Sequence, residues 1–199
     1  MRTQIDDKPS DTALGVALAI LAVLMVLVAL DAKAMGMIPE NIRVPANQTL
    51  SLEAHAIGVQ IYDCKPSKDD PSRYEWVFRS PEADLYDLTG KRIGKHYAGP
   101  TWESNDGSKA VGVTKAKNDG PDATAIPWLL LSVKSTSGVG VLDHTVSVQR
   151  IETVGGIAPA EGCGPAQAPG QTPVEARVPY TATYDFFVEQ PAPRTASYY

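Results

Sequence analysis

Short runs of alternating apolar and polar residues, separated by glycine and proline, dominate the sequence after residue 48. Alternation with a period of two is typical of a strand that packs one of its faces on a core. In the segment 74–79, for example, Tyr74, Trp76 and Phe78 take every second position. We therefore expect about nine or ten strands. The predicted runs are 50–53, 59–62, 74–79, 83–88, 91–97, 108–114, 128–134, 145–153 and 177–189.

Turn-forming residues lie between these runs. The sequence contains 16 glycines and 16 prolines, and Gly90, Gly107 and Gly138 stand where a hairpin needs a positive φ. No segment after Ala34 repeats apolar residues with a helical period over three turns, so helices are at most short. These features predict an all-β domain, either an antiparallel β-sandwich or a barrel. The continuously apolar residues 125–131 predict a central strand that is buried on both faces.

A long apolar run precedes this domain. It begins at Ala13, ends at Leu30 and contains no charged or polar side chain. At about 1.5 Å of rise per residue, a helix of this length is about 27 Å long, close to the roughly 30 Å of a bilayer's hydrocarbon core. We expect one N-terminal apolar helix that enters a membrane, either as a transmembrane anchor or as a signal.

The sequence supports both interpretations of this helix. Residues 32–34 read Ala-Lys-Ala, the small-residue pattern of signal-peptide cleavage, which would give a secreted protein cleaved after Ala34. The run is, however, longer than the usual signal-peptide core of about 7 to 15 residues, and aspartates in segment 1–12 offset its two basic residues. We favour an uncleaved, single-pass anchor in the cell membrane. In both cases the C-terminal domain lies on the periplasmic or extracellular side.

The two cysteines, Cys64 and Cys163, lie far apart in the sequence and both follow the apolar run. An isolated pair without C-x-x-C spacing fits a structural disulfide better than a metal or redox motif. Two buried thiols are the alternative. A disulfide would form and persist outside the cytoplasm, which agrees with an exported domain.

Motifs for nucleic acids, metals and cofactors are absent from the sequence. The net charge is -5 and the basic residues are scattered, which argues against a nucleic-acid partner. The three histidines, His55, His96 and His144, form no HxH or HxxxH pair, so we expect no metal site. In segment 138–143, Asp143 replaces the third glycine of a dinucleotide motif and a predicted strand follows. We therefore expect no cofactor.

The densest polar and aromatic segment is 94–108, which joins two strands or strand ends through a Gly-Pro pair. Its candidate binding residues are His96, Tyr97, Trp102, Glu103 and Asp106. In one interpretation, Glu103 or Asp106 polarises His96 as the general base of a hydrolase-like enzyme. In another, tryptophans of the domain stack on sugar rings. The simplest account is structural, with aromatic residues in the core or at its rim and the acids satisfying nearby backbone groups.

The sequence also resembles a known family. The segments GVQIYDC, HYAGPTWE, IPWLLL, GGIAPAEGCG and VPYTATYDFF, in this order within roughly residues 50–188, are similar to an uncharacterised exported family described as domain of unknown function family 3455. The resemblance implies no established activity and no catalytic residues. Both cysteines fall in matching segments, which supports their pairing by analogy. Some members carry a malate dehydrogenase label, and the missing dinucleotide motif argues against that activity here.

These observations divide the chain into five parts: an N-terminal flank (1–12), the apolar helix (13–30), a connector (31–48), an extracytoplasmic β-domain (49–189) and an extended tail (190–199). The leading hypothesis for function is a non-catalytic, membrane-anchored interaction module, an accessory subunit that docks on another membrane or envelope protein. The alternative is a secreted protein that binds a carbohydrate or another small ligand with Tyr97, Trp102 and Glu103. A hydrolase-like enzyme is the third hypothesis, and we favour a protein that is not an enzyme.

Overall fold

The computed structural model describes residues 38–164 and 175–191, in which a compact unit begins at Pro39. The apolar run 13–30 and the last residues of the tail lie outside the described residues. None of the helices in the described part is long and apolar enough to cross a bilayer. The described elements are η1 (Glu40–Ile42), β1 (Gln48–Pro66), β2 (Tyr74–Tyr86), β3 (Arg92–Tyr97), β4 (Thr101–Ser104), β5 (Lys109–Asn118), β6 (Trp128–Ser137), β7 (Thr145–Gly155) and β8 (Glu175–Glu189).

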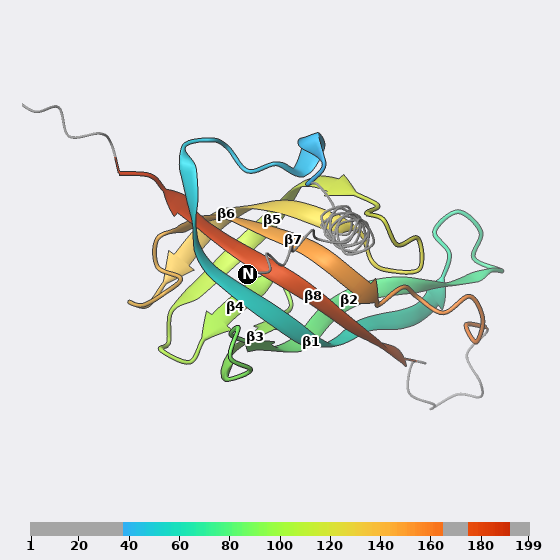
Figure 1. The fold of residues 1–199 in the computed structure, drawn as a ribbon. Helices are drawn as coiled ribbons and strands as arrows, with labels where there is room; N and C mark the ends of the chain where they lie inside the picture. The colour runs from blue at the N-terminus through green and yellow to red at the C-terminus, as the bar shows by residue number, and fades with distance from the viewer. Residues whose placement is uncertain (1–37, 165–174, 192–199) are drawn as a thin grey trace, which may run out of the picture. The chain divides into compact units, whose positions relative to one another are not determined.

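The eight strands form an antiparallel meander that closes on itself. Each strand pairs with the next one along the chain, and β8 returns to pair with β1. Figure 1 shows β1 and β8 side by side along much of their length. The predicted antiparallel all-β fold is confirmed. The hydrogen-bonded order of the strands is that of a closed barrel.

The predicted number of strands is wrong, because four of the predicted runs belong to two long strands. β1 contains the first two predicted runs, and β2 contains most of the next two. The pairing register of β1 against β2 shifts between Ile61 and Tyr62. On β2 this shift falls between Phe78 and Ser80, at the end of the predicted run 74–79, and it interrupts the alternation within that continuous strand. β4, with four residues, is absent from the predicted runs.

The predicted turns at Gly90, Gly107 and Gly138 are confirmed, with φ angles of 82°, 89° and 75°. At Gly138 glycine is required for a second reason. A Cβ atom there would lie 2.5 Å from the carbonyl oxygen of Gly107. The β4–β5 and β6–β7 connections therefore approach each other as closely as their backbones allow.

Packed side chains fill the barrel end at which β2–β3, β4–β5 and β6–β7 are connected, which we call the closed end. The β6–β7 connection buries Leu142 there, with 1% of its surface exposed. The backbone N–H of Leu142 donates a hydrogen bond to the Ser108 hydroxyl (3.1 Å). The buried cluster to which it belongs consists of Ala54, Ala56, Ala83, Leu85, Trp102, Ala110, Ile126, Leu131, Leu142, Val148, Tyr180, Ala182, Tyr184 and Phe186.

β6 is buried on both faces, as the sequence predicts, although the strand begins only at Trp128. Leu131 belongs to the barrel core, and Leu130 lies on the opposite face, where η1 contacts β5 and β6. On that outer side, the Gln149 amide donates a hydrogen bond to the Ile42 carbonyl (2.7 Å). The 3-10 helix therefore covers a part of the barrel wall that would otherwise expose apolar surface.

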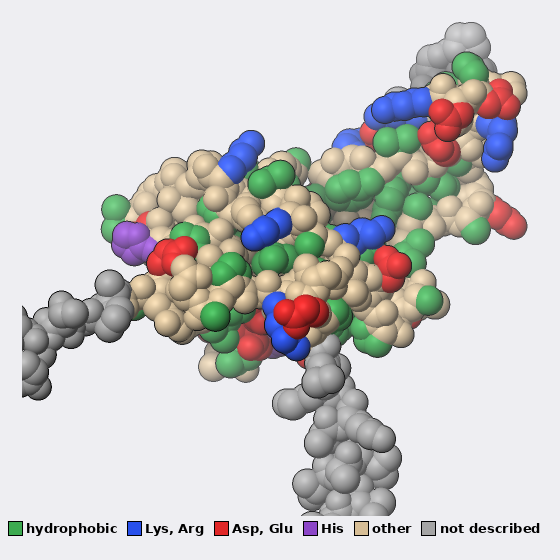
Figure 2. Space-filling model, turned by 90° about the horizontal axis from the view of Figure 1, so that it is seen from above, with side chains coloured by type: hydrophobic (Ala, Val, Ile, Leu, Met, Phe, Trp, Pro, Cys, Tyr) green, Lys and Arg blue, Asp and Glu red, His purple; other side chains and the backbone are tan. Residues whose placement is uncertain are grey.

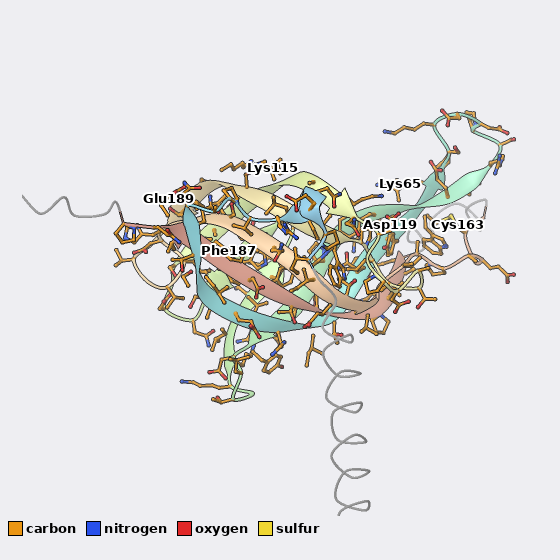
Figure 3. The ribbon with its side chains drawn as sticks, turned by 45° about the horizontal axis from the view of Figure 1, so that its top comes forward. Lys65, Lys115, Asp119, Cys163, Phe187 and Glu189 are labelled. Carbon is orange, nitrogen blue, oxygen red and sulfur yellow. A yellow bond between two sulfur atoms is a disulfide. The ribbon has the colours of Figure 1, made fainter. Side chains whose placement is uncertain are left out.

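The β1–β2 hairpin projects from the other end of the barrel, which we call the hairpin end (Figure 1). The predicted disulfide is confirmed: Cys64 of β1 is bonded to Cys163, and their Cα atoms are 5.3 Å apart. Figure 3 shows Lys65 and Cys163 at this end and Glu189 at the opposite one. Acidic and basic side chains gather together on the projecting hairpin in Figure 2, and both signs are interspersed on the rest of that face.

Candidate functional site

A cavity of about 150 Å³ lies inside the barrel toward the hairpin end. The β3–β4 connection contributes Gly99 and Pro100 to its wall. Thr114 lines the cavity and is also exposed to solvent, so it stands at the mouth. The lining residues are Gln60, Phe78, Arg79, Pro81, His96, Gly99, Pro100, Trp102, Thr114, Leu129, Leu131, Arg150 and Tyr184.

Three of the most deeply buried lining residues carry polar atoms without a partner. Gln60, Trp102 and Tyr184 are 2%, 0% and 1% exposed. Their Nε2, Nε1 and hydroxyl atoms, respectively, have no hydrogen-bond partner in the part of the chain that the structure describes. An unsatisfied buried donor costs about 1–3 kcal/mol, and buried polar groups in folded proteins are almost always paired. Gln60 and Tyr184 lie near the Tyr180 hydroxyl, and Tyr184 also lies near Arg150, but none of these approaches has the distance and angles of a hydrogen bond. The three atoms are therefore available to a bound molecule or to ordered water in the cavity.

The aromatic wall of the cavity is built by two paired strands. His96 on β3 lies opposite Trp102 on β4, and both side chains point into the barrel. Their rings stack with centroids 4.8 Å apart and an angle of 13° between the planes. The ring of Tyr184, from β8, lies 4.9 Å from His96 and 5.5 Å from Trp102. Gly112 on β5 makes room for the indole, because a Cβ there would lie 3.0 Å from the Trp102 ring.

Burial fixes the protonation state of these rings. His96 lies completely inside the barrel, and loss of hydration lowers its pKa to about 3. Its Nδ1 atom is 2.9 Å from the Thr101 carbonyl oxygen. A carbonyl only accepts, so Nδ1 carries the proton and Nε2 is left as an acceptor. Burial also raises the pKa of the Tyr184 hydroxyl, which keeps it protonated.

Two arginines complete the cavity wall. Arg79 of β2 is paired with Asp63 (3.0 Å) and Glu175, so its charge is compensated. Arg150 of β7 instead donates from Nε and Nη2 to the Pro127 carbonyl oxygen, at 3.1 and 2.7 Å. No aspartate or glutamate is among the residues that line the cavity.

The structure separates the candidate residues that the sequence grouped together. His96 and Trp102 line the cavity, whereas Tyr97 and Glu103 lie on the outer face of the same two strands. The Tyr97 hydroxyl donates to Glu103 (2.7 Å), and this hydrogen bond lowers the pKa of the carboxyl. Lys109 reaches the same carboxylate at 3.4 Å. His96 is thus hydrogen-bonded to a carbonyl, and Glu103 is held on the other side of the barrel wall.

Asp106 belongs to the closed end and not to the cavity. Its carboxylate accepts hydrogen bonds from the Ser108 hydroxyl (2.6 Å), the Ser108 N–H (2.9 Å) and the Val141 N–H (2.9 Å). These bonds lower the pKa of Asp106 to about 2. Asp106 therefore links the β4–β5 connection to the β6–β7 connection and is not a neighbour of His96.

The tryptophans do not form an exposed platform for sugar rings. Trp102 and Trp128 are 0% and 5% exposed. Trp76 is partly exposed and donates its indole N–H to the Glu161 carbonyl (3.1 Å), beside the disulfide. A sugar or other ring could meet Trp102 only by entering the cavity.

Within residues 38–164 and 175–191, no group of three or more His, Cys, Asp or Glu side chains is arranged to hold a metal ion. His55, His96 and His144 lie on β1, on β3 and just before β7, respectively. The polar atoms of the cavity are donors and neutral acceptors, which suit an organic molecule better than a cation.

The sequence interpretation missed Gln60, Arg150 and Tyr184 as cavity residues. A signal for Arg150 is present in the sequence. Val146 and Val148 share one face of the predicted strand 145–153, and Arg150 continues that face two residues later. A charged residue on the apolar face of a strand points into the core unless the strand bends away.

The part of the chain that forms the barrel matches a known protein family. Residues 45–188, more than half of the chain, match the family described as "Protein of unknown function (DUF3455)", and the chain belongs to this family. The match begins just before β1 and ends within β8, so it covers all eight strands. No curated protein and no solved structure matches the chain significantly.

Proposed function

We propose that the barrel is an extracytoplasmic binding module that holds a small molecule in its interior. The observation that carries the proposal is the cavity of about 150 Å³ beside three unpartnered polar atoms on Gln60, Trp102 and Tyr184. Small-molecule sites are typically concave and mostly apolar, with a few polar groups that orient the ligand. Closed barrels of about eight strands are wide enough to hold one small ligand.

The chemistry of His96 favours binding over general-base catalysis. A base that works near neutral pH needs a pKa close to that pH, and burial lowers the pKa of His96 to about 3. Its ring is also held by a stacked indole and a backbone carbonyl, without a carboxylate beside it. In the binding module, His96 supplies a flat wall and one neutral acceptor.

The disulfide supports a location outside the cytoplasm, where such bonds persist. We propose that residues 13–30 anchor the module in the membrane. The hypothesis of an accessory subunit rests on this run and on the tail, of which 192–199 lie outside the described residues, and it stays a prediction. A ligand-binding barrel is compatible with it, because the cavity occupies the interior and leaves the outer wall available to a partner.

The proposal predicts saturable binding of one-ring molecules by the full-length protein in detergent micelles. The probes are benzamide and benzoate, and calorimetric titration measures their binding. Thr114→Trp, which places a large ring at the mouth, is expected to weaken binding of whichever probe binds by at least about tenfold. Val113→Trp is the matched control, because Val113 is 52% exposed and does not line the cavity.

Two results would contradict the proposal. Neither probe binding to the wild-type protein would mean that the cavity holds only water. Equal binding in the Thr114→Trp and Val113→Trp variants would mean that the probes bind elsewhere on the surface. Far-ultraviolet circular dichroism of both variants checks that the barrel is intact.

A further inference from the structure

The wall of the cavity carries positive charge without a compensating acid of its own. Among the residues that the structure describes, two arginines and no carboxylate line it. Arg79 is neutralised from outside the cavity by Asp63 and Glu175. Arg150 has no carboxylate oxygen within 4.0 Å among the described residues. It donates to the Pro127 carbonyl, and the Tyr184 hydroxyl is a further neutral neighbour of its guanidinium. Its charge therefore faces the barrel interior unpaired.

Arg150 retains the capacity to bind an anion. A guanidinium has five N–H donors, and the bonds to Pro127 use only those on Nε and Nη2. In register, Arg150 lies opposite Tyr184 on β8 and Leu129 on β6, both of which line the cavity. The charge of Arg150 on β7 also contributes to lowering the pKa of His96, which lies on β3, a strand that is not adjacent to β7. The charge of Arg150 therefore acts on a residue of another part of the barrel wall.

The remaining wall suits an apolar or aromatic body. The stacked His96–Trp102 pair forms one side, and Leu129 and Leu131 add aliphatic surface. A cavity of about 150 Å³ holds a single benzene-sized molecule in a protein interior. The unpartnered Trp102 Nε1 and Gln60 Nε2 atoms are donors, which add to the preference for a ligand rich in acceptor oxygens.

We propose that the cavity binds a small organic carboxylate of one-ring size, with its carboxylate on Arg150 and its body against the His96–Trp102 stack. This inference rests on the proposed function and names the chemical class of its ligand. A guanidinium binds a carboxylate through two parallel hydrogen bonds, which gives both strength and orientation. Burial of the pair inside the barrel limits competition from water and salt.

Calorimetric titration of the full-length protein with benzoate and benzamide tests the inference. The two probes have nearly the same shape, and only benzoate is charged. We expect benzoate to bind at least tenfold more tightly than benzamide. Arg150→Gln is expected to remove this preference, because it weakens the binding of benzoate by at least about tenfold more than the binding of benzamide. Arg150→Lys, which keeps the charge but not the paired donors, should retain part of the preference.

The matched control is Arg92→Gln, which removes the same charge from the outer surface, where Arg92 pairs with Asp84. It should leave the benzoate preference unchanged. Equal affinity of the wild-type protein for the two probes would overturn the anionic ligand but keep the binding module. An undiminished preference in a folded Arg150→Gln variant would do the same. Binding of neither probe would overturn the proposed function itself, and displacement of benzoate by chloride or phosphate at equal concentration would show a site for inorganic anions only.

Discussion

Asp106 illustrates how one exposed carboxylate can hold two distant connections of the barrel together. It accepts two hydrogen bonds from Ser108 within its own turn and one from the Val141 N–H, 35 residues away in sequence. All three donors favour the charged carboxylate, which is why its pKa falls from 3.8 to about 2. The closed end of the barrel is therefore sensitive to acid at this residue.

We predict that Asp106→Asn lowers the free energy of unfolding at pH 7 by about 1 kcal/mol, a charge-assisted hydrogen bond discounted for exposure to solvent. Because the pKa in the folded state lies below the ordinary value, the charged group stabilises the fold above about pH 4, and this stabilisation is lost as the pH falls toward 2. The difference between variant and wild type should therefore shrink over that range. Urea unfolding at several pH values measures it.

Asp70→Asn is the matched control for this prediction. Asp70 accepts the same pair of hydrogen bonds from Ser72, but both lie within one exposed turn. Its replacement should cost less than that of Asp106, since no second element is released. A pH-independent difference between Asp106→Asn and the wild type would contradict the assigned role of the carboxylate.

The candidate site could be predicted from the sequence only in part, and strand geometry explains which part. Neighbours along a strand face opposite sides, so the pairing register decides which residues face the cavity. It places His96 and Trp102 on the inner face and Tyr97 and Glu103 on the outer face. Arg150 and Tyr184 come from strands that are remote in sequence from the 94–108 segment. No local pattern brings these residues together, since the closure of β8 on β1 does so.

At the scale of elements, Pro81 explains why β2 reads as two strands. Proline has no N–H, so it cannot donate a hydrogen bond to a neighbouring strand. β2 pairs with β3 only between Ala83 and Tyr86, so Pro81 lies where β2 has a partner on the β1 side alone. Proline is tolerated in such a position, and the strand continues through it. The sequence shows the proline but not which neighbour is missing.

The disulfide links β1 to the connection that follows β7, and it closes a loop with a sequence separation of 99 residues. A cross-link of this length restricts the unfolded chain, which stabilises the fold by up to about 4–5 kcal/mol in the chain-entropy model. We predict that reduction, or the double substitution Cys64→Ser and Cys163→Ser, lowers the free energy of unfolding by an amount approaching this value. Urea unfolding with and without reductant measures it.

The double variant also provides the control, because reductant should not change its stability. If the wild-type protein unfolds at the same urea concentration with and without reductant, the prediction fails. Binding of the cavity probes should persist in the folded double variant. Neither cysteine is among the residues that line the cavity.

At the scale of the whole molecule, the chain joins the barrel, for which we propose ligand binding, to an apolar run that we propose as a membrane anchor. The run 13–30 lacks charged and polar side chains, so its transfer into hydrocarbon is favourable. The disulfide supports our proposal that the barrel lies outside the reducing cytoplasm. An anchor would keep a binding module at the membrane surface, whereas cleavage after Ala34 would release it.

We predict that the protein purified from its native membranes retains residues 1–34 and resists extraction by alkaline carbonate. The reason is the length of the apolar run, which exceeds an ordinary signal-peptide core. Carbonate extraction of the membranes tests the second expectation, and intact mass spectrometry tests the first. The mass before and after reduction also reports the disulfide, because reduction adds two hydrogens to it. Ala34→Leu is the control, since it blocks signal-peptide cleavage and should leave the mass pattern of an uncleaved protein unchanged apart from the substitution. A soluble species that begins at Met35, and that disappears in the Ala34→Leu variant, would instead establish a secreted binding protein.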